Sequence, residues 1–194
     1  MNKKLYPVVT YFNKDFEDEV RILQNELFEI TGARASLDEW RPHVTVGKAL
    51  WVEDEELQKL IQELNDFTQT QSVFEIEFDG FGYMDDWAGA EAFHCEPYVV
   101  YVDVVVNDDL RNYVEKLAKI LNKYEHRYVI HKDNFHMTLA FKDLNKEGFE
   151  KAKKYLIGRS FKRKIKVDSL SLVLDTEKGD VIKEVVNLKF GKND

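Results

Sequence analysis

Two short segments of this 194-residue chain, RPHVTV (residues 41–46) and NFHMTL (residues 134–139), share one pattern. In each segment a histidine and a threonine are two positions apart, within a run of residues that favour strands. Because successive side chains of a strand point to opposite faces, the histidine and the threonine should share one face. Their apolar neighbours should lie on the other. The pattern therefore predicts two strands, each with a polar face and a buried apolar back.

The two segments supply two imidazoles and two hydroxyl groups, His43 with Thr45 and His136 with Thr138. Imidazole titrates near neutral pH, which makes His43 and His136 candidate acid-base groups. Either segment alone is better explained as a buried strand whose histidine is hydrogen-bonded and inert. Two copies in matching surroundings indicate a functional site, with the four side chains arranged around one cavity.

The two halves of the chain have the same expected order of elements: strand, long helix, histidine strand, shorter helix, strand. The shift that places His43 on His136 also aligns the two threonines. No linker rich in Pro, Gly or Ser separates the halves. We therefore expect a single domain over residues 1–194, made of two pseudo-symmetric lobes at about residues 1–95 and 96–194.

The expected fold class is α+β. Apolar residues that recur at steps of three and four indicate helices, and alternating or β-branched runs indicate strands. Residues 98–106 form a nearly continuous apolar run, which is typical of a central strand. A bilobed, pseudo-twofold duplication would place two antiparallel-rich sheets across a central cleft from one another, with the helices on the outside.

The sequence also predicts where several elements begin and end. Gly47 and Lys48 are expected to close the first histidine strand, and Gly80 and Gly82 to lie in turns. Residues 164–174 read as one strand, and residues 181–190 as another, joined by a hairpin turn at residues 178–180. The expected helix caps are Asn13 or Asp15, Asp108 or Asp109, Asn145, and Gly32 at a C-terminus.

The composition narrows the class of protein. Hydrophobic residues make up 44% and aromatic residues 13% of the chain, as expected of a globular protein. The 28 basic and 36 acidic residues give a net charge of −8, which argues against a protein that coats long nucleic acids. The single Cys95 allows no internal disulfide and fits a reducing compartment. With neither a secretory signal nor a membrane span in view, we expect a cytoplasmic protein.

RPHVTVGK (residues 41–48) and HMTLAF (residues 136–141) resemble the signature of the 2H phosphoesterase superfamily, which includes bacterial 2′-5′ RNA ligase-like proteins and cyclic phosphodiesterases. The resemblance implies a duplicated, bilobed α+β fold. It implies that the two histidines act as base and acid, in an order that the sequence leaves open. It also implies that the two threonines bind the phosphate. Many members have a proline before the second histidine and a basic residue five places after it, where this chain has Phe135 and Phe141, followed by Lys142.

The expected function is a metal-independent phosphodiesterase that hydrolyses a 2′,3′-cyclic phosphate, or a related 2′-linked or cyclic nucleotide phosphate. Its partner would be a small nucleotide or an RNA end, with no cofactor, no metal, no membrane and no obligate protein partner. A non-catalytic RNA- or nucleotide-binding protein and a 2′-5′ RNA ligase remain as alternatives. A metal-dependent hydrolase is disfavoured because neither motif contains a carboxylate. The physiological substrate, the regiochemistry of the product and the oligomeric state stay open.

Four residues near the motifs are further candidates. Arg41 could bind phosphate or form a salt bridge at the rim, and Asn134 is its counterpart in the second half. Tyr11 and Trp40 could stack on a nucleobase, although packing is the more common role of aromatic residues beside strands. Lys48 lies at an odd step from the first histidine and should face away from it.

Three other groups have plainer explanations. Residues 94–96 (His-Cys-Glu) lack further metal ligands nearby and are expected to form a partly buried strand. His126 and His131 are expected on surface loops. The basic residues between 151 and 166 could contact RNA, but a solvated helix face followed by an exposed strand is the preferred interpretation.

Overall fold

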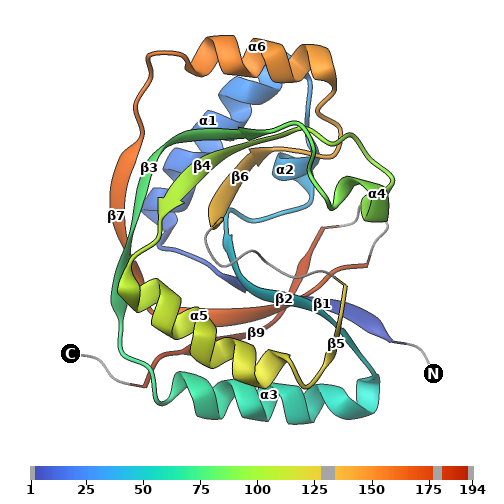
Figure 1. Ribbon diagram of the computed structural model, residues 1–194, viewed down its shortest axis with the longest axis vertical. Coiled ribbons are helices and arrows are strands. Elements are labelled where there is room, and N and C mark those ends of the chain that lie inside the picture. Colours follow the sequence, from blue (N-terminus) through green and yellow to red (C-terminus); the bar gives the residue numbers. More distant parts are fainter. Residues whose placement is uncertain (1–2, 128–133, 177–180, 192–194) are drawn as a thin grey trace.

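The computed structural model describes residues 3–127, 134–176 and 181–191, and these form two antiparallel sheets with helices at both ends of the molecule (Figure 1). The expected α+β class, with two antiparallel sheets and flanking helices, is confirmed. The strand order is β5-β2-β1-β8-β9 in one sheet and β6-β4-β3-β7 in the other. The 98–106 run forms β4, an interior strand of its sheet, as expected.

The first sheet consists of β5 (Glu125–His126), β2 (Val44–Val52), β1 (Lys4–Thr10), β8 (Ser169–Leu174) and β9 (Lys183–Lys189). The second consists of β6 (His136–Ala140), β4 (Val99–Val105), β3 (Phe74–Met84) and β7 (Lys162–Val167). The helices are α1 (Lys14–Thr31), α2 (Ala35–Asp38), α3 (Asp54–Thr68), α4 (Ala90–Phe93), α5 (Asp108–Leu121) and α6 (Lys146–Leu156).

Each half of the sequence contributes to both sheets. Strand β3 closes the first half but pairs with β4, and β8 of the second half pairs with β1. Helix α1 follows β1 and contacts β6 of the other sheet, while α5 follows β4 and contacts β2. Figure 1 shows α1 and α6 together at one end, and α3 with α5 at the other. The two sheets are therefore held together by elements that cross between them.

The apolar backs of the two histidine segments lie in the core. The side chains of Val44, Val46, Met137 and Leu139 are each at most 1% exposed, whereas the histidines and threonines that alternate with them are half-buried. Burying such a side chain stabilises the fold by about 1.5–3 kcal/mol. The predicted alternation of faces is thus confirmed for both segments.

Asparagine side chains begin three of the helices. The side-chain oxygens of Asn13, Asn107 and Asn145 accept hydrogen bonds from backbone N–H groups in the first turns of α1, α5 and α6. Each bond pairs a donor that the helix itself leaves unpaired. Asn13 and Asn145 were expected, but the expectation of Asp108 or Asp109 for α5 was wrong, because Asn107 holds the extended cap conformation. Gly32 ends α1 in the left-handed region, as expected.

Two strands continue through glycines that were expected to end them. Strand β2 continues through Gly47 to Val52. A glycine is needed at this position because the strand packs closely there: a Cβ would lie 2.6 Å from Leu121 Cδ1 and 2.8 Å from Val8 Cβ. Strand β3 runs to Met84 through a bulge near Gly80, whose φ is 82°. The tight packing and the bulge, rather than turns, explain these glycines.

The segment 164–174 is not one strand. It divides at Asp168 between β7 and β8, which belong to different sheets. Most of β7 is exposed at a sheet edge, while β8 is buried between β1 and β9. A continuous strand could not satisfy both environments. The predicted turn at 178–180 lies outside the described residues.

Candidate active site

The two histidines occupy corresponding positions at the starts of two strands that contact one another. His43 directly precedes β2, and His136 is the first residue of β6. Both imidazoles and the hydroxyl-bearing Thr45 and Thr138 are half-buried. The charge of His136 acts on His43, so the fold brings the two motifs to one region.

Both imidazole rings are oriented by the same kind of backbone contact. The Nδ1 atom of His43 lies 2.8 Å from the carbonyl oxygen of Arg41, and Nδ1 of His136 lies 3.4 Å from that of Asn134. A carbonyl oxygen only accepts, so Nδ1 carries the proton in each neutral ring. Nε2 is then the nitrogen available for proton transfer. Among the described residues, neither Nε2 has a hydrogen-bond partner.

The threonine hydroxyls are also available. Within the described part of the chain, no hydrogen bond engages the side chain of Thr45 or Thr138. In the antiparallel ladders, Thr45 lies opposite Val9 and Thr138 opposite Tyr101. A ligand placed between β2 and β6 could accept a hydrogen bond from either hydroxyl.

The surroundings of His43 favour its neutral form. Burial lowers the pKa of His43 to about 4, although the carbonyl of Arg41 acts in the opposite direction. The positive charges of His136 and Arg21 lower that pKa further. His43 is therefore an unprotonated imidazole at neutral pH.

The surroundings of His136 are different. Burial lowers the pKa of His136 below its ordinary value, while the carbonyl of Asn134 and the negative charge of Asp103 act in the opposite direction. Asp103 lies directly opposite His136 in the ladder between β4 and β6. The ring of Tyr101 lies 4.8 Å from the imidazole, and this Tyr ring extends over Gly82, where a Cβ would be only 2.2 Å away.

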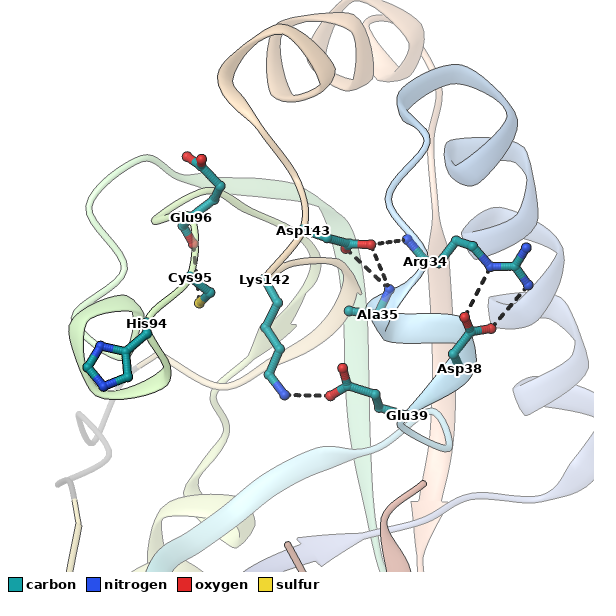
Figure 2. A pocket seen from close by; sticks show the side chains of 9 residues that line it. All are labelled: Arg34, Ala35, Asp38, Glu39, His94, Cys95, Glu96, Lys142 and Asp143. Atoms are coloured by element: carbon teal, nitrogen blue, oxygen red, sulfur yellow. Dashed lines mark hydrogen bonds and ion pairs between the residues drawn. The ribbon is translucent and has the colours of Figure 1, made fainter. Parts of the chain in front are cut away.

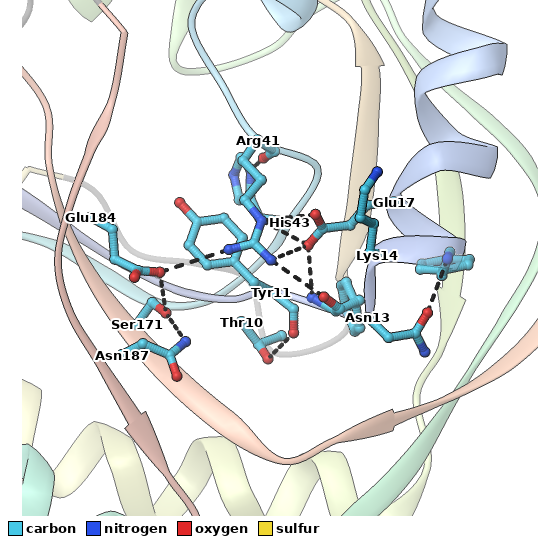
Figure 3. Close-up of polar contacts among 12 residues, drawn as sticks. Thr10, Tyr11, Asn13, Lys14, Glu17, Arg41, His43, Ser171, Glu184 and Asn187 are labelled. Carbon is cyan, nitrogen blue, oxygen red and sulfur yellow. Dashed lines mark hydrogen bonds and ion pairs between the residues drawn. The ribbon is translucent and has the colours of Figure 1, made fainter.

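Arg41 is engaged in an ion-pair network (Figure 3). Its Nε lies 2.8 Å from both carboxylate oxygens of Glu17, whose side chain is only 12% exposed, and its Nη1 lies 3.9 Å from Glu184. The guanidinium also lies 4.3 Å from the centre of the Tyr11 ring. The structure thus places Arg41 in a salt bridge beside the site. Its carbonyl, rather than its side chain, contacts His43.

Tyr11 and Trp40 pack around His43. The Trp40 ring stacks on the imidazole at 4.6 Å, and the Tyr11 ring meets it edge-on at 6.4 Å. Tyr11 is 5% exposed and clusters with Val9 and Val173. Burial raises the pKa of Tyr11 to about 12, so its hydroxyl stays protonated. Both rings enclose His43 in this structure.

The chain matches the model of a known family over a span that includes both histidine motifs. The model of a family described as the 2′-5′ RNA ligase superfamily matches residues 34–179, a span that contains both histidine motifs. The chain belongs to the 2′-5′ RNA ligase superfamily. No curated protein matches the chain.

Solved structures of low sequence identity share the fold of this superfamily member. E. coli LigT in complex with 3′-AMP matches with a TM-score of 0.67 and 10% identity, covering 98% of this chain and 100% of LigT. TT0787 of Thermus thermophilus has a TM-score of 0.60 and 15% identity, covering 96% and 98%. A phosphoesterase has a TM-score of 0.62 and 11% identity, covering 97% and 99%. At these identities the matches show the fold alone.

Lys142 lines a pocket of about 690 Å³ (Figure 2). It is the basic residue that follows the second motif of this superfamily member. Its ammonium forms an ion pair with Glu39, and both side chains are largely buried. Asp143 accepts hydrogen bonds from the backbone N–H groups of Arg34 and Ala35. None of the four motif side chains lines this pocket.

Other candidates are placed as follows. His94, Cys95 and Glu96 form a loop after α4 that lines the same pocket, so the expected strand there was wrong; His94 has a left-handed backbone, with φ of 50°. His126 lies in β5 rather than in a loop, and its Nε2 is 3.3 Å from Lys48 Nζ. His131 lies outside the described residues.

The basic residues between 151 and 166 lie mostly on exposed faces, as expected. Several are paired with carboxylates: Arg159 with Glu26, Lys162 with Glu77, and Arg163 with Glu19. Across the residues described, no group of three or more His, Cys, Asp and Glu side chains could hold a metal ion. No helix in this part of the chain is long and apolar enough to cross a membrane.

Sequence reasoning did not single out Arg21, Gln24, Tyr101 and Asp103. Gln24 did carry a signal, because it lies between Val20 and Leu27 on the apolar stripe of α1, where a polar residue needs a buried partner. Asp103 similarly interrupts an apolar strand. The partners of these residues are distant in sequence and become visible in the fold.

Proposed function

We propose that this protein is a metal-independent phosphodiesterase that hydrolyses a 2′,3′-cyclic phosphate, or a related 2′-linked or cyclic nucleotide phosphate, of RNA or nucleotides. One observation carries this proposal. Two imidazoles at the starts of two contacting strands are oriented in the same way through Nδ1, and within the described residues both leave Nε2 without a partner. Such a pair suits a reaction that removes one proton and delivers another.

Opening a cyclic phosphodiester needs a base for the attacking water and an acid for the leaving oxygen, which lie roughly in line across phosphorus. We assign the base to His43, because burial and the charges of His136 and Arg21 lower its pKa to about 4. We assign the acid to His136, because Asp103 opposes the lowering of its pKa by burial. An anionic phosphate would raise the pKa of both rings, and His136 would protonate first.

In the proposed reaction, Nε2 of His43 accepts the proton of water as its oxygen attacks phosphorus. The protonated Nε2 of His136 gives its proton to the leaving ribose oxygen as the bond between phosphorus and that oxygen breaks. Thr45 and Thr138 donate hydrogen bonds to the non-bridging oxygens, where negative charge develops. Proton transfer through water then returns the two rings to their starting states.

Structures of E. coli LigT support the ligand class. They contain 3′-AMP, phosphate, NADP+ or ATP. These ligands share a phosphate group, and three of them are nucleotides. A nucleotide phosphate is therefore the ligand class that we propose for this chain.

The proposal is tested with 2′,3′-cyclic nucleotides, 2′-5′ dinucleotides and a 5′-hydroxyl RNA acceptor, each assayed with excess chelator. We expect hydrolysis of the cyclic phosphate to persist, and to be lost in His43→Ala and His136→Ala but kept in His126→Ala. Activity that disappears with chelator and returns with one divalent ion would replace the metal-independent mechanism. Tight binding without turnover of any substrate would favour a nucleotide-binding protein.

A further inference from the structure

One arginine of α1 holds the segment that leads into the first motif. Arg21 Nη1 donates to the carbonyl oxygens of Ser36 at 3.0 Å and Leu37 at 3.2 Å. Its Nη2 donates to the carbonyl oxygen of Trp40 at 2.6 Å. Since the Trp40 ring stacks on His43, the guanidinium holds the residue that covers the imidazole.

The same arginine is linked to the second motif through Gln24. Arg21 Nη1 donates to the side-chain oxygen of Gln24 at 3.0 Å, and Gln24 Nε2 donates to the backbone carbonyl of Thr138 at 3.0 Å. Gln24 is 3% exposed, so its amide depends on these partners. The side chains of Arg21 and Gln24, one turn apart on α1, therefore connect the loop before His43 to the strand that carries Thr138.

The charge of Arg21 is not neutralised by an ion pair among the described residues, where its partners are the carbonyl and amide oxygens named above. Negative charges that act on Arg21 are those of Glu17 and Asp38. Glu17 is itself bound to Arg41, and Asp38 to Arg34. A partly buried positive charge thus remains close to His43.

The charged and titratable groups around His43 come from four directions. They are Arg21 of α1, His136 of β6, Tyr11 after β1, and the Arg41 network with Glu17 and Glu184. Arg21 and His136 act on the imidazole directly, and both disfavour its protonation. Asp103 acts on His136.

We propose that Arg21 and Gln24 are positioning residues for both His-x-Thr motifs: their hydrogen bonds to Trp40, to each other and to Thr138 set the distance between the motifs. The charge of Arg21 adds to the effect of burial in disfavouring protonation of His43. This inference rests on the proposed function for its effect on turnover. A lysine at position 21 could keep the positive charge, but its ammonium group lacks the planar arrangement of donors with which the guanidinium binds several oxygens at once. The two contributions of Arg21 are therefore separable by substitution.

Three variants and one control test the proposal. Arg21→Gln removes the charge, and Arg21→Lys keeps the charge but not the fork. Gln24→Met keeps Arg21 but removes both hydrogen bonds of the Gln24 amide, to Arg21 and to Thr138. Arg163→Gln is the matched control. Arg163 is an exposed arginine of β7, and its partner Glu19 lies on α1, the helix that carries Arg21. The pKa of His43 is read from the NMR titration of its ring without substrate, together with kcat, KM and the thermal midpoint.

We expect Arg21→Gln to raise the pKa of His43, since a positive charge that acts on the imidazole is lost. Arg21→Lys should leave that pKa nearly unchanged while kcat falls roughly 10–100-fold with little change in KM, because the motifs are displaced. Gln24→Met should lower kcat without moving the pKa of His43. Arg163→Gln should change neither.

Two results would overturn the proposal. One is an unchanged pKa of His43 in Arg21→Gln, which would remove the role of the charge. The other is unchanged kcat in both Arg21→Lys and Gln24→Met, which would remove the role in positioning. If Arg21→Gln does not fold, Arg21→Lys and Gln24→Met still test the role in positioning. The role of the charge is then tested with the double variant Glu17→Gln/Asp38→Asn, which removes the negative charges that act on Arg21. A raised pKa of His43 in this double variant would contradict that role. If the wild-type protein hydrolyses no phosphodiester, the proposed function fails, whereas the titration still tests Arg21.

Discussion

Asp103 of β4 lies opposite His136 of β6 in an antiparallel ladder, and its negative charge raises the pKa of this histidine against the effect of burial. Arg21 of α1 acts on His43 with the opposite charge, and it adds to the larger effect of burial in lowering the pKa of His43. The two motifs are alike in sequence and in their Nδ1 contacts. Their difference in charge environment is the basis on which we propose His43 as the base and His136 as the acid.

Asp103→Asn should shift the alkaline limb of the pH–rate profile to lower pH, by up to about one unit. Without the carboxylate the pKa of His136 falls, so the proposed acid loses its proton earlier. The profile is measured as kcat against pH, with Asp79→Asn as the control, since Asp79 pairs with Lys162 at a sheet edge. An alkaline limb that stays in place, or moves equally in the control, would assign the acid to another group.

Replacing either histidine should reduce turnover strongly. His43→Ala and His136→Ala should each lower kcat by roughly 10²–10⁴-fold, the usual contribution of a positioned acid or base. The double variant should lose much less than the product of the two effects, because the groups act together. Single-turnover rates of folded variants test this, and strictly multiplicative losses would contradict a shared mechanism.

Removing one motif hydroxyl should cost less. Thr45→Ala and Thr138→Ala should each lower kcat by roughly 10–10³-fold, through loss of one hydrogen bond to the developing charge. Thr70→Ala is the control, since its hydroxyl bonds to the Phe67 carbonyl at 2.7 Å in an exposed turn. Equal activity in all three variants would mean that the motif hydroxyls do not contact the reacting phosphate.

Folding stability should fall as the pH is lowered. The ordinary pKa of histidine is 6.5, and that of His43 in the folded protein is about 4. Between these values the unfolded chain binds more protons than the folded one, so stability decreases as pH falls through this window. Urea midpoints from pH 7 to pH 4.5 should show this loss. His43→Ala should flatten the dependence, and an unchanged slope would contradict the assigned environment.

Gly47→Ala should destabilise the fold by about 1–3 kcal/mol through overpacking against Leu121 and Val8. Urea unfolding measures the loss. Because the nearest atom belongs to Leu121, combining the change with Leu121→Ala should cost less than the sum of the two single changes. Additive free energies would show that the two positions do not compete for space.

The sequence predicted local structure well. A period of two placed the apolar residues of both motifs in the core, and recurring apolar residues located α1, α3, α5 and α6. Asn13, Asn145 and Gly32 mark helix ends by chemistry that acts within a few residues. At Gly47 and Asp168 the expectation failed because of a contact or an exchange of sheet made by residues far away in the chain. At the start of α5 it failed for a local reason, because Asn107 caps the helix.

The candidate site likewise contains residues that the sequence predicted and residues that only the fold brings near them. The sequence alone identified His43, Thr45, His136 and Thr138, because the alternation of faces in a strand is a property of neighbouring residues. The tertiary structure decided which groups surround them: Arg21 and Gln24 from α1, Asp103 from β4, and the pairing of Arg41 with Glu17. Charges and hydrogen bonds act through space. The bond from Gln24 to Thr138 therefore depends on the packing of α1 against β6, which no local pattern encodes.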